Sequence, residues 1–447
     1  MSVVMKFGGT SVADAAAFEN VARVIASERD GPPVVVVSAM SGVTDSLLAA
    51  TDIAAIENVF ERHRGVAHEL LDASRAAAFI DRLHEAHDQL AALLRSLAQN
   101  PAEHKQLKDA ISSFGETLSS TLLAEVLNQK QIKARQGDAR HCIITDEEFT
   151  SAAPVMAQTF AQTKSELLPV LESGVVPVLG GFIGSTRAGV TTTLGRGGSD
   201  YTAALMGAAL GANEIQIWTD VTGVLTADPR VVPEALTVER LSYGEAAELA
   251  YFGAKVLHPK TIQPAIENAI PVRICNSRAP RERGTLVGPE SEASPRTIKA
   301  IAHKTGVTTV QITSARMLGA YGFLRALFAV FERHRTVVDV VTTSEVSVSL
   351  SLDDASSLPA IVAELEDLGT VRVERGRAII CVVGEGLRGT PGIAARVFST
   401  ISDINVTLIS QGASSINFTF AIEEERVKEA VTRLHDDFFT TKRHAGQ

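Results

Sequence analysis

The sequence predicts an α/β protein built on a doubly wound, mostly parallel sheet. Two observations near the N-terminus carry this prediction. A short apolar segment at residues 3–7 leads into paired glycines and a helical pattern over 14–27, and the β-branched run at 34–37 leads into a second glycine turn and helix, which Thr44 or Asp45 could cap. Strand, glycine-rich turn and helix repeated in this order are typical of parallel sheets covered by helices.

The elements that follow fit the same fold class. Residues 50–130 are rich in Ala, Leu, Glu and Arg at helical spacing and predict a helical layer, which Gly115 and Glu116 interrupt. A Ser-x-x-Glu capping box at 242–245 opens another helix. The remaining expected elements are strands near 132–135, 142–144, 175–179 and 214–220, a helix over 157–172 and a last strand over 271–275.

A second domain is predicted after residues 276–296, where prolines and glycines among charges indicate a linker. Beyond it, residues 322–328 match 392–398 with the same Gly-to-Phe spacing, and each copy leads through a short helix into a β-rich segment, 337–352 or 405–421. Two copies of one βαβ-type unit explain this economically. Two unrelated amphipathic helices are the alternative.

Composition excludes several classes of protein. The 447 residues carry a net charge of −10 and no dense basic tract, which argues against a nucleic-acid partner. The three cysteines are far apart, so buried thiols are expected rather than disulfides or a zinc site. Neither a signal peptide nor an apolar run of the ~18 residues needed to span a membrane is present, and we expect a soluble cytoplasmic protein.

The stretch TTTLGRGGSD at residues 191–200 is the first candidate site. Its glycines allow close approach of the backbone, Arg196 can bind a carboxylate or phosphate as a fork, and Ser199 and Asp200 begin an apolar helix that Gly211 ends. A helix N-terminus attracts anions. From this stretch alone, an anion site and an ordinary Ser/Asp helix cap are equally good interpretations.

Four motifs in order resemble those of the aspartokinases, members of the amino acid kinase family. They are KFGGTS at 6–11, TLGRGGSDYT at 193–202, WTDV at 218–221 with DPR at 228–230, and FGAKVLHP at 252–259. The C-terminal repeat, which ends in GASS at 412–415, resembles the paired ACT domains of these enzymes. The resemblance implies an α/β/α kinase domain over 1–290, then two ferredoxin-like βαββαβ ACT domains over 300–380 and 381–447, the second of which can interleave with the first.

Further residues look most like the lysine-sensitive, monofunctional branch of the family. These are the segments 338–339 and 342–348. Because the sequence ends at Gln447, we expect no homoserine dehydrogenase module of the kind found in bifunctional relatives.

The implied reaction converts ATP and L-aspartate into ADP and 4-phospho-L-aspartate, the first step toward lysine, threonine and methionine. The nucleophile is a carboxylate whose ordinary pKa is about 3.9, so no general base is required. The site must neutralise charge and align two anions. Cations, glycines and carboxylates are therefore the expected site residues, and His258 is interpreted as structural.

The resemblance assigns catalysis to Lys6 and Asp200. Lys6 would reach the transferring phosphate, and Asp200 would orient Lys6 or a magnesium-bound phosphate. The residues assigned to aspartate are Thr44, Glu116, Arg196 and Ser199. The plainer alternatives are a surface lysine for Lys6, a solvated helix carboxylate for Glu116 and a helix N-cap for Thr44.

The resemblance also assigns a nucleotide site. Its residues are Lys6, Phe7, Gly8, Gly9, Thr219, Asp220, Leu225, Arg230, Lys255 and Val256. Leu225 stands where relatives often carry Tyr, so only a backbone or apolar contact is expected there. Mg²⁺ would be held mainly by the ATP phosphates, without a protein metal site.

The ACT pair implies an amino-acid effector, with L-lysine the first choice. The expected effector residues are Met317, Gly322, Phe323, Leu324, Val338, Asp339, Ser344 and Glu345, with Asp339 pairing with the effector ammonium. Ala320 and Val337 stand where lysine-sensitive relatives often have hydroxyl groups. A structural ACT pair without effector is the alternative, and a homodimer or homotetramer through the ACT domains is expected.

Two other functions stay open from the sequence. One is an amino acid kinase that acts on glutamate, an acetylated amino acid or a nucleoside monophosphate. The other is a non-catalytic amino-acid sensor that keeps the fold, which loss of Lys6, Arg196 or Asp200 would have favoured.

Overall fold

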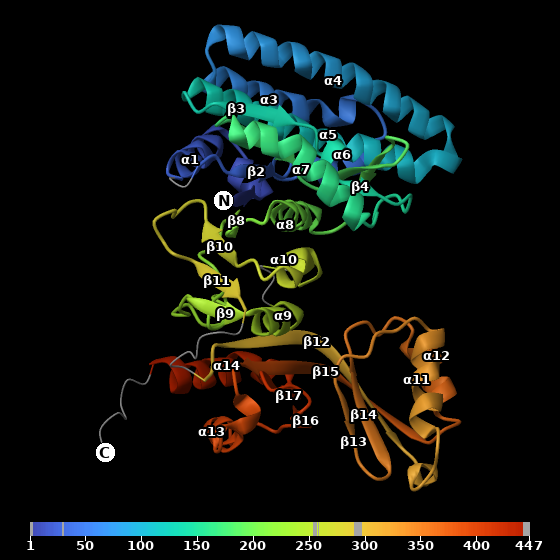
Figure 1. Ribbon diagram of the computed structural model, residues 1–447. Coiled ribbons are helices and arrows are strands. Elements are labelled where there is room, and N and C mark those ends of the chain that lie inside the picture. Colours follow the sequence, from blue (N-terminus) through green and yellow to red (C-terminus); the bar gives the residue numbers. More distant parts are fainter. Residues whose placement is uncertain (1–2, 29–30, 254–256, 258, 290–296, 441–447) are drawn as a thin grey trace. The chain divides into compact units, whose positions relative to one another are not determined.

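The chain forms two compact units, each described here by itself (Figure 1). The computed structural model describes residues 3–28, 31–253, 257, 259–289 and 297–440. The first unit consists of Met1–Val224, Glu239–Tyr243 and Val256–Glu290. The second consists of Leu225–Val238, Gly244–Lys255 and Ser291–Gln447, so two segments of the predicted kinase range group with the C-terminal part.

An eight-stranded sheet forms the centre of the first unit. Its strand order is β3-β5-β2-β1-β8-β10-β11-β9, and all neighbours are parallel except the antiparallel pair β10 and β11. The strands are β1 (Val4–Phe7), β2 (Val34–Val37), β3 (Ala134–Gly137), β5 (Val176–Gly180), β8 (Ile215–Thr219), β9 (Arg240–Ser242), β10 (Val272–Asn276) and β11 (Thr285–Gly288). This mostly parallel order confirms the predicted fold class.

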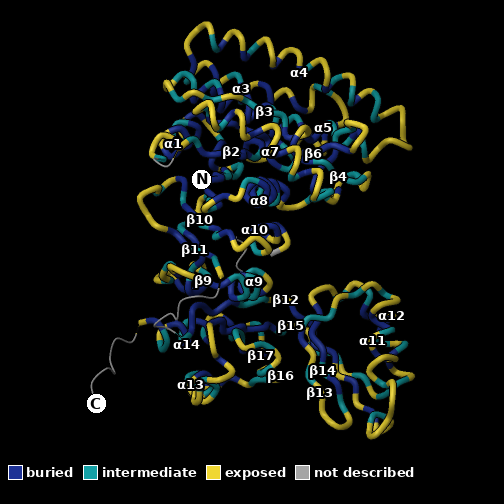
Figure 2. The backbone as a smooth tube through the Cα atoms, in the orientation of Figure 1, coloured by how far each residue is buried: buried dark blue, intermediate teal, exposed yellow. Residues whose placement is uncertain are grey.

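Helices cover both faces of this sheet (Figure 1). On one face lie α1 (Ala15–Ala26) and α5 (His104–Gln129), with α2 (Val43–Ala49), α3 (Glu57–Leu70) and α4 (Ala73–Gln99) packed outside them. On the other lie α7 (Met156–Glu172), α8 (Gly198–Leu210) and α10 (Gln263–Glu267). Figure 2 shows α8 almost entirely buried, whereas much of α4 is exposed.

A small three-stranded sheet lies beside the large one. It consists of β4 (Ile144–Thr145), β6 (Ile183–Thr186) and β7 (Thr191–Thr193), and the short helix α6 (Ala139–Cys142) packs against β6. β7 ends directly before the glycine-rich stretch at 194–200. The three cysteines are buried and free, as predicted from their spacing.

Three local predictions were wrong. Neither Thr44 nor Asp45 caps α2, because the helix begins after Gly42, which adopts a left-handed φ of +79°. Gly115 and Glu116 do not interrupt a helix but lie inside α5. The strand at 272–276 is not the last of the sheet, because the predicted linker contains β11, which the left-handed Gly284 turns back against β10.

The second unit contains a six-stranded antiparallel sheet of order β13-β14-β12-β15-β17-β16. Its strands are β12 (Ala300–Thr313), β13 (Val341–Thr343), β14 (Ser347–Leu352), β15 (Thr370–Val383), β16 (Leu408–Gln411) and β17 (Asn417–Glu423). Its helices are α9 (Tyr243–Tyr251, whose first residue belongs to the first unit), α11 (Phe323–Arg333), α12 (Leu358–Leu365), α13 (Ile393–Thr400) and α14 (Val427–His435).

Two hydrophobic cores divide this sheet. One joins the second half of β12 and the first half of β15 to α11 and α12, and the other joins the first half of β12 and the second half of β15 to α13 and α14. The first copy therefore has the strand and helix order βαββαβ. The second copy takes its sixth strand from the first half of β12, which precedes the first copy in the sequence. Gly322 and Gly392 begin matching helices at φ +82° and +85°, which confirms the predicted repeat.

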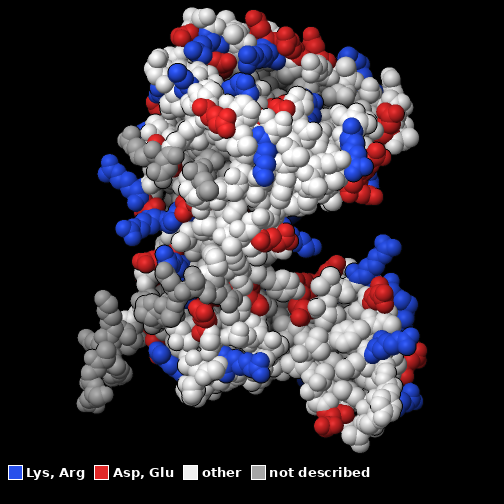
Figure 3. Space-filling model, viewed as in Figure 1, with Lys and Arg blue, Asp and Glu red and all other residues white. Residues whose placement is uncertain are grey.

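Charges of both signs are interspersed on the surface. On the face drawn in Figure 3, Lys and Arg side chains alternate with Asp and Glu rather than forming one basic area.

Gly115 offers a test of how α5 is packed. A Cβ at this position would lie 2.7 Å from the Cβ of Ala39, whereas a Cβ at Gly65 in α3 would meet nothing within 4 Å. Gly115→Ala should lower the free energy of unfolding by about 1–3 kcal/mol through overpacking. The matched control Gly65→Ala should raise it by about 1 kcal/mol, the helix-propensity gain. Urea unfolding of both variants checks this, and a stabilised Gly115→Ala would contradict the packing described.

Candidate active site

A lysine and an aspartate form a largely buried ion pair at the end of β1. Alternation along this strand turns Met5 and Phe7 into the core beneath α1 and α5, so Lys6 points to the other face of the sheet. There its Nζ lies 2.7 Å from Asp200 Oδ1 in the first turn of α8, and the two side chains are only 12% and 17% exposed. Lys6 is therefore not an ordinary surface lysine.

The glycine-rich stretch begins α8 without a side-chain cap. Gly197 is the N-cap residue, and both Gly195 and Gly197 have a left-handed φ of +74°. No side chain donates or accepts the capping hydrogen bond, and Asp200 faces Lys6 instead. The interpretation of Ser199 and Asp200 as an ordinary cap was therefore wrong.

The two glycines that end β5 bring α5 and α8 together. A Cβ on Gly180 would lie 2.9 Å from the Cβ of Glu116, and a Cβ on Gly181 would lie 2.7 Å from Ser199. Any side chain at either position would push one helix away. Glu116 and Ser199, which are predicted to bind the same substrate, thus pack against two adjacent glycines.

Glu116 is a fully buried carboxyl group. It is 3% exposed, and burial raises its pKa to about 8, although the backbone N–H groups of Ala39 and of Glu116 itself lower it in part. Its Oε2 has no hydrogen-bond partner among the described residues. Glu116 is therefore not a solvated helix carboxylate, and that alternative was wrong. A buried oxygen without a partner is costly, so Glu116 favours an incoming cation or hydrogen-bond donor.

Arg196 and Thr44 are the other two residues predicted to bind aspartate. Arg196 is exposed and forms no ion pair within the part of the chain that the structure describes, so its guanidinium can accept an external carboxylate. Thr44 lies in the first turn of α2 and has no capping role. The role of both in substrate binding stays a prediction.

Asp109 is a residue of this site that sequence reasoning missed. Its buried carboxylate accepts hydrogen bonds from Thr150 N (2.8 Å), Thr193 N (3.0 Å) and Thr193 Oγ1 (2.7 Å). It fastens the end of β7 to α5 immediately before the glycine-rich stretch. A spacing of seven residues places Asp109 and Glu116 on nearly the same side of α5, and this signal could have found it.

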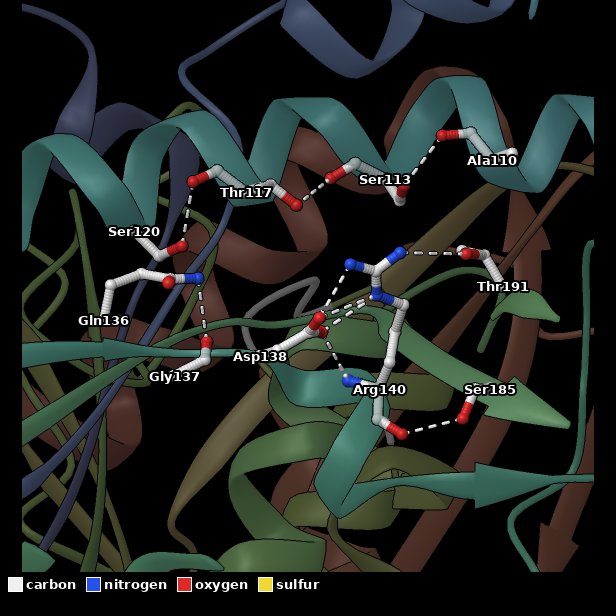
Figure 4. A network of polar contacts seen from close by, with 10 residues as sticks. All are labelled: Ala110, Ser113, Thr117, Ser120, Gln136, Gly137, Asp138, Arg140, Ser185 and Thr191. Atoms are coloured by element: carbon white, nitrogen blue, oxygen red, sulfur yellow. Dashed lines mark hydrogen bonds and ion pairs between the residues drawn. The ribbon is translucent and has the colours of Figure 1, made fainter. Parts of the chain in front are cut away.

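A polar cleft of about 440 Å³ lies on the neighbouring side of α5 (Figure 4). Thr117, Ser120 and Gly180 line it, together with the ion pair of Asp138 and Arg140, whose closest contact is 2.6 Å. Arg140 Nη1 also reaches Thr191 Oγ1 at 3.4 Å. The pair thus ties α6 to β7 and supports the strand that carries the glycine-rich stretch.

The carboxyl ends of β1, β8 and β10 are joined by hydrogen bonds beside the predicted nucleotide residues. Gly8 N donates to Trp218 O at 3.1 Å, and Ser277 Oγ donates to Thr219 O at 3.0 Å. Ser11 Oγ donates to Ser277 Oγ at 2.9 Å. Asp220 follows this edge and accepts from Thr219 Oγ1 at 3.1 Å. Ser11 and Ser277 were not singled out from the sequence.

The structure describes two of the other four predicted nucleotide residues, Leu225 and Arg230. Leu225 and Arg230 belong to the second unit, where Leu225 bridges to Thr237 and Arg230 pairs with Asp228 at 2.6 Å. Lys255, Val256 and His258 lie outside the described residues.

The predicted effector residues gather in the second unit around α11 and β13. Met317, Phe323 and Val338 pack against the core of the first copy, while Leu324 is 41% exposed. Gly322 begins α11, and Ser344 Oγ contacts Ser347 Oγ at 2.7 Å in the turn between β13 and β14 that also holds Glu345. Asp339 has a side chain that is only 2% exposed.

Comparison with known proteins decides the family. The profile of the amino acid kinase family matches residues 1–276, and an ACT domain profile matches residues 380–438. Lysine-sensitive aspartokinase 3 of Escherichia coli is 39% identical over 98% of this chain and 99% of its own length. The chain belongs to the aspartokinases.

Other relatives agree with this aspartokinase assignment. Aspartokinase 3, chloroplastic, of Arabidopsis thaliana is 41% identical over 99% of this chain and 82% of its own length. The crystal structure of E. coli aspartokinase III in complex with aspartate and ADP matches with a TM-score of 0.81 at 37% identity, covering 98% of this chain and 100% of that one. These similarities confirm the predicted resemblance, the kinase fold and the aspartate kinase function. The alternative of an amino acid kinase with another substrate is therefore excluded.

Among the described helices of this aspartokinase, none combines the length and the apolar character that crossing a membrane requires.

Because burial raises the pKa of Glu116, the free energy of unfolding should depend on pH. Between its ordinary pKa of 4.5 and its folded value of about 8, the folded protein holds a proton that the unfolded chain has lost. Stability therefore falls as the pH rises through this window. Glu116→Gln should raise the free energy of unfolding at pH 8 by a few kcal/mol, on the order of 1.4 kcal/mol for each pKa unit, and should change it little near pH 4.5.

Urea unfolding at several pH values measures this difference. Glu125→Gln, on a part-exposed position of the same helix, is the control and should show no such growth with pH. An equal effect of Glu116→Gln at both pH values would contradict the origin of the shift in burial.

Proposed function

We propose that this aspartokinase transfers the γ-phosphoryl group of ATP to the side-chain carboxylate of L-aspartate through a site centred on Lys6 and Asp200. A carboxylate oxygen of aspartate forms the new bond to the γ-phosphorus, the bond from phosphorus to the β-γ bridging oxygen breaks, and ADP leaves with that electron pair. No proton needs to be removed. The observation that supports this most is the buried 2.7 Å ion pair, which places a cation beside a helix N-terminus at the ends of parallel strands.

Lys6 is the residue that neutralises charge on the transferring group. Asp200 holds its ammonium in one position at a site that is mostly closed to water, so little reorganisation is needed when negative charge shifts toward ADP. Gly9 is proposed to offer its N–H group to a phosphate oxygen, whereas the N–H group of Gly8 already donates to Trp218 O. A Cβ on Gly9 would lie 2.9 Å from Ala39 O, so this turn admits no side chain.

L-Aspartate is proposed to lie between α5 and the glycine-rich stretch. Its ammonium would be accepted by Glu116, its α-carboxylate would be bound by Arg196, and Ser199 and Thr44 would donate hydrogen bonds. The fully buried Glu116 supports this division of roles, because a carboxyl group without a partner gains most from an incoming cation. A relative supports the substrates, since the E. coli aspartokinase III structure is in complex with aspartate and ADP.

ATP is proposed to bind along the ends of β1 and β8. Phe7, Gly8, Gly9, Thr219 and Asp220 would contact it from the first unit, and Leu225, Arg230, Lys255 and Val256 are the further proposed contacts. The carboxylate of Asp200, which lies beside Lys6, fits a Mg²⁺ ion that arrives with the ATP phosphates. Mg²⁺ would supply further neutralisation of phosphate charge.

L-Lysine is proposed as the inhibitor, bound in the second unit by Asp339 and the residues around α11 and β13. The support is the full-length similarity to lysine-sensitive aspartokinase 3, together with the structure of the E. coli enzyme in complex with lysine and aspartate, which matches with a TM-score of 0.82 at 36% identity. We keep 1–290, 300–380 and 381–447 as the proposed domains, and a homodimer or homotetramer through the ACT pair as the proposed assembly.

The activity is tested by trapping the acyl phosphate. With ATP, Mg²⁺ and L-aspartate, hydroxylamine should yield aspartyl hydroxamate. Replacing aspartate by glutamate or acetylglutamate should give little product, and a reversed preference would contradict the proposal. A protein that binds aspartate but forms no hydroxamate would be the non-catalytic sensor.

Lys6→Met should lower kcat by at least about 10²-fold, because one preorganised charge is lost from the transition state. The substitution also leaves Asp200 unpaired, which itself destabilises the fold. The double variant Lys6→Met/Asp200→Asn removes both charges and should recover thermal stability without recovering kcat. A double variant with normal turnover would remove Lys6 from catalysis.

A further inference from the structure

Three groups of the second unit surround one lysine. Lys304 of β12 forms an ion pair with Asp353, its Nζ lies 3.6 Å from Asp339 Oδ2, and the same Nζ stands 4.7 Å from the ring centroid of Tyr251. Asp339 precedes β13, Asp353 follows β14 and Tyr251 ends α9. Segments about a hundred residues apart in sequence thus converge on a single ammonium group.

The arrangement has the chemistry of an ammonium receptor. Carboxylates and the face of an aromatic ring are the groups that proteins place around primary and quaternary ammonium ions. Two acids share one cation here, and Asp339 Oδ2 has no hydrogen-bond partner among the described residues. Burial and the neighbouring Asp353 raise the pKa of Asp339 to about 7. The receptor is therefore short of positive charge.

We propose that Asp339, Asp353 and the ring of Tyr251 form an ammonium-binding site that Lys304 fills as an intramolecular ligand, and that the amino-acid effector binds by displacing Lys304 with its own ammonium group. This inference rests on the proposed function, which assigns Asp339 to the effector. It adds Asp353 and Tyr251 to the effector site and makes Lys304 the competitor.

Exposure of the groups permits such an exchange. Tyr251 is 46% exposed and the Asp353 side chain 41%, whereas Asp339 is closed. The open side gives a ligand access, and the flexible stem of Lys304 can leave toward solvent. The effector ammonium replaces the Lys304 ammonium in the same surroundings, so the free energy of the exchange is close to zero. The fraction of sites that hold the effector therefore responds to effector concentration.

Displacement of Lys304 has a direct consequence for α9. Lys304 connects β12 to this helix through Tyr251. The chain that follows Tyr251 enters the motif at 252–259, which contains Lys255, a residue proposed to contact the nucleotide. An effector that removes Lys304 from Tyr251 therefore removes one of the contacts that hold α9 on β12, beside the close approach of Gly253 to His303 O. Lys304 in its site favours the active arrangement, and effector binding and nucleotide binding must oppose one another reciprocally.

The variant Lys304→Met tests this inference, because it keeps most of the apolar stem and removes the ammonium. We use the full-length protein, L-lysine as the probe, calorimetry for binding and hydroxamate formation for activity. The dissociation constant for L-lysine should fall about fivefold, as expected when a competing, partly exposed ion pair is removed. Activity without lysine should fall as well, because the tie to α9 is already broken.

Two further variants separate the parts of the inference. Lys428→Met, at an exposed lysine of α14 in the same unit, should change neither quantity. Tyr251→Leu should lower activity without lysine but leave the lysine affinity within about twofold, because Lys304 and the effector ammonium lose the same contact with the ring. Tyr251→Leu also keeps the inference testable if Lys304→Met does not fold.

The outcomes are distinguishable. If the unmodified protein is active but binds no lysine, the effector assignment of the proposed function falls, and this inference falls with it. If the unmodified protein binds lysine and Lys304→Met binds it equally or more weakly, only the competition by Lys304 is overturned. Normal activity of both Lys304→Met and Tyr251→Leu overturns the link to α9.

Discussion

The catalytic unit depends on one steric constraint, the bare backbone of Gly180 and Gly181 at the end of β5. Helices α5 and α8 lie on opposite faces of the sheet, yet residues of both come within van der Waals contact of these two glycines. A side chain at either glycine would separate Glu116 from Ser199. Because β5 ends there, functional groups from the two faces reach one point beyond the strand ends, where open α/β sheets bind ligands.

The charged groups of this site differ in whether they have a partner of opposite charge. Lys6 and Asp200 compensate one another, so their burial is tolerated, whereas Glu116 is buried without a cation and is held in its protonated form at neutral pH. Under the proposed function, an incoming substrate ammonium would supply the missing charge to Glu116. Binding the amino acid and ionising Glu116 would then be linked.

Sequence reasoning predicted the sheet and the repeat because both are local patterns. The valine run at β2 and the Gly-to-Phe spacing of α11 and α13 carry their own signal. Gly115 led to a wrong prediction, because a glycine among helical residues resembles a helix break. In the fold it lies inside α5 and leaves room for Ala39. Asp109 and β11 were missed because their partners, Thr193 and β10, are defined only by the tertiary fold.

The chain passes from the first unit to the second between two groups of the proposed nucleotide residues. Thr219 and Asp220 belong to the first unit, while Leu225 and Arg230, only a few residues later, belong to the unit that holds the ACT pair. In that unit Thr226 O accepts from Ile301 N of β12, and Thr226 Oγ1 lies 2.8 Å from His435 Nε2 of α14. A change in β12 therefore reaches the segment that carries Arg230 through direct hydrogen bonds. Lys304 lies three residues after Ile301 on the same strand, so the proposed displacement of Lys304 would act on this segment as well as on α9.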